Sequence, residues 1–187
     1  MSYTMIADIG NTLVNLLRDS LVPKIISDES LIGLCSPNDN DNFILSVYLY
    51  NIELNQNMRM NSYIDNGTDI QVRPPVFLNL YYMITPHSRS EIKFKSYENQ
   101  IILGKIIQVL NDCASFVDKN GNVFHVDIMN LSYSDKRNIL SNFETKNNNL
   151  SLFYRISPVE IESNSTRRIV RVSDFDFSSG AINPSNK

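Results

Sequence analysis

Two long runs of β-branched, aromatic and aliphatic residues constrain the fold of this chain more than any other feature. The first is FILSVYLYNIEL at Phe43–Leu54, and the second is VFLNLYYMIT at Val76–Thr85. A polar stretch, Asn55–Val72, separates them. This arrangement predicts two neighbouring antiparallel strands joined by a long hairpin loop. Because the first run is apolar almost throughout, we expect both faces of that strand to be covered.

Three helices are predicted. After Thr4, which we expect to be an N-cap, apolar residues recur at steps of three and four until Pro23; they are Ile6, Ile9, Leu13, Leu16 and Leu17. The same spacing predicts a second helix over Tyr97–Cys113, capped by Ser96. A shorter helix is expected at Ser134–Phe143.

The remaining segments favour short strands in a mostly antiparallel sheet. Strands are expected at Val123–Leu131, at Leu150–Ile161 with a kink or an end at Pro158, and at Arg167–Val172. The Leu31–Asp41 stretch is predicted to be a loop after a possible short strand. Strands therefore group as hairpins rather than as βαβ units. We predict an α+β fold in which two main helices pack on one face of the sheet. The expected domain covers residues 1–173, and a polar tail covers residues 174–187.

Composition narrows the class of protein. The net charge of −3 provides no basic field for nucleic acid, and no stretch approaches the roughly 18 apolar residues that a membrane span requires. The N-terminus does not resemble a secretory signal. Cys35 and Cys113 lie far apart in the sequence and form no CxxC pair, so we expect buried free thiols in a cytosolic protein.

Residues suited to catalysis or metal binding are sparse. Neither His87 nor His125 has a Cys, Asp or Glu at a metal-ligand spacing, so each is expected to be a surface or partly packed histidine. The string DIGNT at Asp8–Thr12 is similar to the phosphate-binding turn of some kinases, but it falls within the predicted first helix. The sequence therefore predicts a protein that is not an enzyme and holds no metal or cofactor.

Aromatic and basic residues remain as candidates for binding. Tyr48, Tyr50, Tyr81 and Tyr82 could form a platform for bases or sugars, although tyrosines at strand spacing are more typical of a core or an oligomer interface. The arginines in RRIVRV, at Arg167–Val172, could meet phosphate. In a chain of negative net charge they more readily meet carboxylates of a protein partner or water.

Several stretches, read in order, resemble one family. These stretches are MIAD at Met5–Asp8 with the following LVNLL, LSVYLYNIELN at Leu45–Asn55, RPPVFLNLYYMITPHS at Arg73–Ser88, ENQIILGKIIQVLNDC at Glu98–Cys113 and LSLFYRISPVEIES at Leu150–Ser163. The strongest signals are the Tyr-Leu-Tyr strand, the Arg-Pro-Pro strand entry and the helix with ILGKIIQVL. In this order they resemble the N-terminal domain of the cap or tail-terminator proteins of extracellular contractile injection systems. The resemblance extends over roughly Met5–Val172.

The resemblance implies a structural role. A protein of this family forms a six-subunit ring at the end of the particle far from the baseplate, stops the inner tube and anchors the last sheath layer. Its expected partners are further copies of itself, the tube protein and the sheath protein. We expect assembly in the bacterial cytoplasm and release of the particle by lysis. An alternative is a monomeric ligand- or carbohydrate-binding module that uses an aromatic sheet face.

A ring closed by rotation needs two different sticky patches on each subunit. The residues chosen for these contacts, by stickiness and expected exposure, are Tyr48, Tyr50, Arg73, Tyr81, Met83, Arg167, Arg168 and Arg171. We further hypothesise that the strand at Arg167–Val172 and the tail after it add a strand to a neighbouring sheath subunit.

Overall fold

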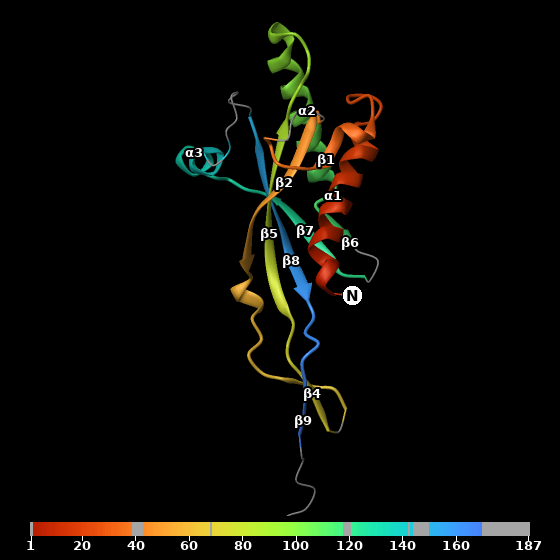
Figure 1. Cartoon of the computed structure of the whole chain (residues 1–187), viewed down its shortest axis with the longest axis vertical. Helices are drawn as coiled ribbons and strands as arrows, with labels where there is room; N and C mark the ends of the chain where they lie inside the picture. The colour runs from red at the N-terminus through yellow and green to blue at the C-terminus, as the bar shows by residue number, and fades with distance from the viewer. Residues whose placement is uncertain are drawn as a thin grey trace, which may run out of the picture. The chain divides into compact units, whose positions relative to one another are not determined.

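The computed structural model describes residues 2–38, 43–67, 69–117, 121–141, 143 and 150–169 (Figure 1). Its contacts divide the chain into two compact units. The first contains Met1–Met60 and Pro75–Glu162, and the second contains Asn61–Pro74 and the segment from Ser163 onward. The predicted boundary between domain and tail, at residues 173 and 174, lies outside the described residues.

A six-stranded sheet forms the centre of the first unit (Figure 1). Its strand order is β1-β2-β5-β8-β7-β6, and every pair is antiparallel except the pair of β1 with β2. The strands are β1 (Ile32–Leu34), β2 (Leu45–Leu54), β5 (Val76–Pro86), β6 (Ser115–Val117), β7 (Val123–Ile128) and β8 (Leu152–Ile161). The predicted α+β class with a mostly antiparallel sheet is therefore confirmed.

The two runs that constrain the fold pair as expected. Leu45 lies opposite Pro86 and Leu54 lies opposite Leu78, with one register shift between Leu49 and Asn51. Pro74 and Pro75 precede β5, where the missing amide hydrogens cost the ladder nothing. The expectation that both faces of β2 are covered holds only for its first residues, because Asn51–Leu54 are exposed. An apolar run predicts a strand, but it does not show that the second half of the strand extends beyond the core and is exposed.

Two helices pack on one face of this sheet. Helix α1 (Met5–Leu21) begins after Thr4, as predicted, although the Thr4 side chain makes no capping hydrogen bond, and α2 (Ile92–Asp112) begins five residues before the predicted start. Their buried side chains join those of β2, β5, β7 and β8 in one apolar core. The third helix, α3 (Tyr133–Ser141), has no buried residue. Ser96 lies inside α2, so its predicted role as the cap is wrong, and Glu91 occupies that position.

The DIGNT string lies inside α1, as its apolar spacing predicts. Gly10 is buried, and a Cβ atom at this position would stand 3.1 Å from Cδ1 of Leu34 on β1. The glycine therefore allows the helix to approach the edge of the sheet, and the phosphate-turn reading of this string is wrong.

The second unit contains a small three-stranded sheet in the order β3-β4-β9. Its strands are β3 (Ile64–Asp65), β4 (Ile70–Val72) and β9 (Thr166–Arg168). The predicted long hairpin loop over Asn55–Val72 thus contains two short strands in its second half. The strands are only two or three residues long and mostly polar, so they carry too little alternation for a sequence pattern to reveal them.

Other differences are local. The Leu31–Asp41 stretch contains β1 rather than only loop, and 3-10 turns occupy η1 (Ser2–Thr4), η2 (Glu29–Leu31) and η3 (Gln56–Met58). β8 continues through Pro158, and its register shifts beside that residue, between its pairs with Leu78 and Leu80. Cys35 and Cys113 are free thiols, as predicted, but are half-buried rather than buried.

Candidate interaction surfaces

The sheet face opposite the two main helices carries a cluster of aromatic rings. Tyr50 on β2 meets Phe153 on β8 edge to face, with ring centroids 5.7 Å apart, and lies 6.1 Å from Tyr81 on β5. Tyr48 meets Phe143, which follows α3, at 5.3 Å. The alternation of side chains along each strand places these rings on the same face. The structure therefore brings Tyr48, Tyr50 and Tyr81 together on one half-buried surface, here called the aromatic face.

Charged groups border the aromatic face. The Tyr81 hydroxyl donates a 2.8 Å hydrogen bond to Oε2 of Glu53, and Nη2 of Arg155 donates one of 2.8 Å to Oδ2 of Asp127. Burial, and then the hydrogen bond to Glu53, raise the pKa of Tyr81, so its hydroxyl stays protonated and remains a donor. This surface presents fixed hydrogen bonds beside packed rings, as protein interfaces commonly do.

Met83 does not belong to the exposed part of this surface. It has 0% exposed surface, between Tyr48 and Phe153 in the strand register. The expected exposure of Met83 is therefore wrong. Both faces of β5 are buried along its second half, and around Met83 the rings of the aromatic face cover the side that the helices leave open.

The basic residues at the other predicted patch lie in the second unit. Arg73, Arg167 and Arg168 are exposed. Nε and Nη2 of Arg167 donate to Oε1 of Gln71 at 2.9 and 2.8 Å, and its guanidinium carbon stands 3.9 Å from the ring centroid of Tyr63. Arg167 is thus held in place by its own unit. Arg171 lies outside the described residues.

Sequence reasoning missed several exposed or packed residues. The first turns of α2 expose Ile92, Phe94 and Tyr97, with 94% exposure at Ile92, because the helix begins before its buried stripe. On β8, Phe153 and Arg155 share the aromatic face. Phe153 and Arg155 are two residues apart within a predicted strand. This spacing could have predicted that both side chains lie on the same face.

The two histidines occupy different environments. His87 is buried, its Nε2 lies 2.9 Å from Oγ of Ser46, and its backbone N–H donates to the carbonyl of Ile44 at 2.7 Å. Burial, and then the charge of Lys95, lower the pKa of His87 to about 4, so its ring is neutral at pH 7. His125 is exposed on β7. Within the described ranges, no group of three or more His, Cys, Asp or Glu is placed to hold a metal ion.

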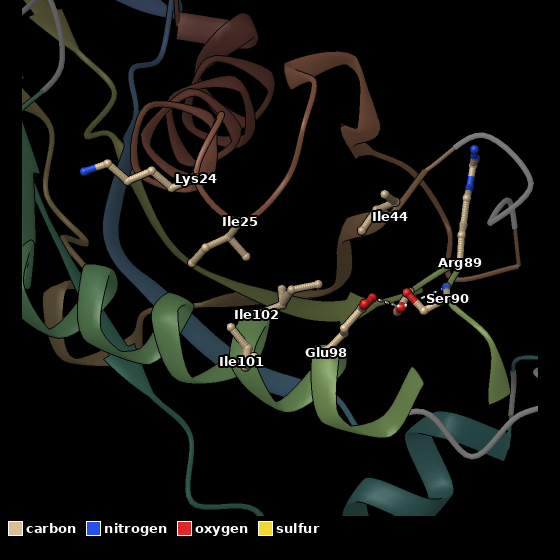
Figure 2. A pocket seen from close by; sticks show the side chains of 9 residues that line it. Lys24, Ile25, Ile44, Arg89, Ser90, Glu98, Ile101 and Ile102 are labelled. Atoms are coloured by element: carbon tan, nitrogen blue, oxygen red, sulfur yellow. Dashed lines mark hydrogen bonds between the residues drawn. The ribbon is translucent and has the colours of Figure 1, made fainter. Parts of the chain in front are cut away.

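A cavity of about 480 Å³ is lined by the turn after α1, the residue before β2, the loop after β5 and one side of α2 (Figure 2). Oγ of Ser88 donates to Oε2 of Glu98 at 2.6 Å, and the Ser88 amide donates to Oδ1 of Asn99 at 2.9 Å. Hydrogen bonds from Ser88 and then Ser90 hold the pKa of Glu98 below its usual value. The remaining lining residues are Lys24, Ile25, Ile44, Arg89, Ile101 and Ile102. These bonds fasten the loop after β5 to α2.

The length and hydrophobicity of the helices bear on whether one of them could span a membrane. None of the helices in the part of the chain that the structure describes is long and apolar enough to cross a membrane.

Comparison with known proteins gives two kinds of match. A family model described as the Pvc16 N-terminal domain matches residues 8–173. The solved PVC sheath/tube terminator of an extracellular contractile injection system, in the extended state, has a TM-score of 0.66 at 16% identity, covering 95% of this chain and 65% of that chain. The tube-terminating cap of the anti-feeding prophage has a TM-score of 0.63 at 17% identity, covering 92% and 60%. No curated protein matches the sequence.

These values show a shared fold. The chain spans less than two thirds of the length of either solved protein. The architecture predicted from the resemblance, that of a tail terminator, is confirmed along nearly the whole chain.

Proposed function

The chain belongs to the Pvc16 N-terminal domain family, and on that basis we propose that it is a tail terminator of a contractile injection particle. In this role it ends the inner tube, anchors the last sheath layer and acts without turnover. The observation that carries the proposal is the family match over residues 8–173, supported by the shared fold with two solved terminators.

The assembly that fits this role is a closed ring of six copies. A ring generated by rotation joins two different patches on each subunit, so each copy must present both. The aromatic face, with Tyr48, Tyr50 and Tyr81, and the arginines of the second unit, Arg73, Arg167 and Arg168, are two chemically distinct surfaces. Aromatic and arginine side chains are also enriched at protein interfaces.

The partners follow from the same role. We propose that the ring contacts the tube protein on one side and the sheath protein on another, and that the segment from Arg167 onward adds a strand to a sheath subunit. Assembly takes place in the bacterial cytoplasm, and lysis releases the finished particle. The two solved proteins that share this fold are described as a sheath/tube terminator and as a tube-terminating cap.

The test combines mass with location. Light scattering behind a sizing column should give a species near six times 21.4 kDa, or a smaller species that assembles when purified tubes are added. Gold-labelled protein should then appear at one end of each tube in negative-stain images. Arg73→Glu reverses the charge of an exposed residue in one of the two proposed contact surfaces, so this variant should fold normally but form fewer rings. Protein that neither forms rings nor binds tube ends would refute the role.

A further inference from the structure

The six-stranded sheet has two edges that its own strands leave partly open. On one side, β1 pairs only with Leu45–Val47 of β2. From Tyr48 to Leu54, β2 has no second neighbouring strand among the described residues. On the other side, β6 is the last strand, and within the described ranges it pairs only with β7. Open edges of this kind are sites where another chain can add a strand.

Backbone direction identifies the groups that face outward on β2. The Asn55 amide donates to the carbonyl of Phe77 on β5 at 2.8 Å. Because successive residues of a strand point to opposite sides in the plane of the sheet, Ile52 and Leu54 direct their backbone groups away from β5. The Ile52 amide is covered by Oδ1 of its neighbour Asn51 at 2.9 Å. The outward groups of Leu54 have no partner within the described chain.

The same reasoning applies to β6. The Val126 amide donates to the carbonyl of Ala114 at 2.9 Å, so Ala114 faces β7. By alternation Phe116 also faces β7, whereas Ser115 and Val117 direct their backbone groups outward. Val117 is 59% exposed, and Leu54 on the opposite edge is 62% exposed.

The two open edges stand at the same level of the sheet. Ile52 pairs with Leu80, Leu80 with Ile156, and Ile156 with Val126, which also bonds Ala114. Ala114 immediately precedes β6, so Ser115–Val117 lies level with Glu53–Leu54. Four successive antiparallel pairings separate β2 from β6, which means that both strands run in the same direction.

Side chains match across these edges as well. Ile52 and Leu54 stand on the helix-covered face, because their partners Leu80 and Leu78 belong to the core. Phe116 pairs with the core residue Phe124 and stands on the same face. If the two edges met, the exposed aliphatic side chains of β2 would pack beside Phe116, as neighbouring residues of one sheet face do.

We infer that β6 of one copy pairs in parallel with the open part of β2 of the next copy, so that the sheet continues from subunit to subunit. The inference rests on the proposed ring and specifies one of its contacts. The two edges are different surfaces at one level, which is the geometry of a contact that closes on rotation. A contact between two β2 edges would instead join copies around a two-fold axis.

Disulfide crosslinking in assembled particles tests the pairing. In a background with Cys35→Ser and Cys113→Ser, we would introduce Glu53→Cys and Ser115→Cys together. Both residues are exposed on the face opposite the main helices, and neighbouring strands hold Cα atoms about 5 Å apart, within disulfide range. Mild oxidation should yield a ladder of covalent multimers that reductant removes. Each single variant should remain monomeric.

Controls separate this inference from the proposed function. Glu53→Cys combined with Tyr133→Cys, at the exposed start of α3, should give no ladder, and circular dichroism should show that every variant is folded. A double variant that is present in particles but stays monomeric would overturn the pairing while leaving the terminator role intact. Dimers from Glu53→Cys alone would also overturn it in favour of a two-fold contact. Absence of the chain from particles would refute both proposals.

Discussion

At the scale of single residues, Met83 shows how the aromatic face is held together. It lies opposite Tyr48 on one neighbouring strand and opposite Phe153 on the other. A flexible thioether fills irregular space between rings and makes favourable sulfur–aromatic contacts. Met83 is therefore a packing residue beneath the surface that the tyrosines present.

The first prediction concerns this packing. Met83→Ala should lower the free energy of unfolding by about 2–5 kcal/mol, because it leaves a cavity beneath the rings. Met83→Leu, which conserves volume, should cost less than about 1.5 kcal/mol. Urea denaturation of the two variants measures both values. Equal stability of Met83→Ala and the native protein would contradict the buried position.

A second prediction follows from His87. Its pKa of about 4 lies below the ordinary value of 6.5, so the unfolded chain binds a proton more readily than the folded chain between these values. Its contribution to stability is complete above about pH 6.5 and is lost as the pH falls toward 4, by up to about 3 kcal/mol.

Denaturation at several pH values measures this effect. The difference in stability between the native protein and His87→Gln should shrink as the pH falls through that window. A difference that stays constant from pH 7 to pH 4 would show that His87 does not titrate in this way.

At the scale of elements, sequence patterns revealed what is long and periodic. The alternation in β5 and the three-four spacing in α1 were sufficient to place both elements, and the spacing in α1 also indicated its buried side. The start of α2 was missed because Ile92 and Phe94 are apolar but exposed, which obscures the stripe. β1 was missed because three residues gain their structure from a parallel neighbour rather than from a local pattern.

The prediction of interaction surfaces was limited in the same way as the prediction of secondary structure. Grouping Tyr48, Tyr50 and Tyr81 required only the pairing of two strands, which the sequence reveals. Whether Met83 is exposed depends on what covers the face of β5 that is turned away from the main helices. Alternation cannot predict this cover where the residues on both faces of a strand are mostly apolar. Gln71 and Tyr63, which hold Arg167, lie far from it in sequence, so no local pattern connects them.

A third prediction concerns the C-terminal element. Deleting Arg167–Lys187 removes the paired residues Arg167 and Arg168 of β9 and the proposed arm; of the residues in this segment that the structure describes, none belongs to the apolar core. The ring should still form, whereas sheath attachment should weaken. Counting particles that retain sheath beyond the tube end measures the effect.

The matched control is a chain that ends after Ser173 and so keeps β9. It tests whether the polar tail, residues 174–187, contributes to attachment. We expect this variant to lose less sheath than the longer deletion. Normal sheath retention by the longer deletion would refute the arm.

At the scale of the whole molecule, the two units differ in what stabilises them. Every residue of the apolar core belongs to the first unit. The second unit depends on short strand pairs and on polar contacts such as the one between Arg167 and Gln71. The first unit should therefore fold without the second.

A fourth prediction tests this independence. Replacing Asn61–Pro74 with a short glycine-serine linker and ending the chain after Glu162 should leave a protein that unfolds cooperatively. The Asn55 amide is hydrogen bonded to the Phe77 carbonyl, so the linker and the few residues that flank it need only close a loop between two neighbouring strands. Calorimetry should show one transition within a few degrees of the native protein. A non-cooperative melt would mean that the second unit is needed for folding.

The chain passes between the two units three times, at Met60, at Pro74 and at Glu162. One passage leads from β4 into β5, and another leads from β8 into β9. In the second unit β4 pairs with β9, and in the first unit β5 pairs with β8. A pull on the second unit is therefore shared by β2, β5 and β8, each at the end that leads into that unit. Because the three strands are loaded in the same direction, withdrawing them would shear the β7–β8 ladder along its length, and many hydrogen bonds would have to break together.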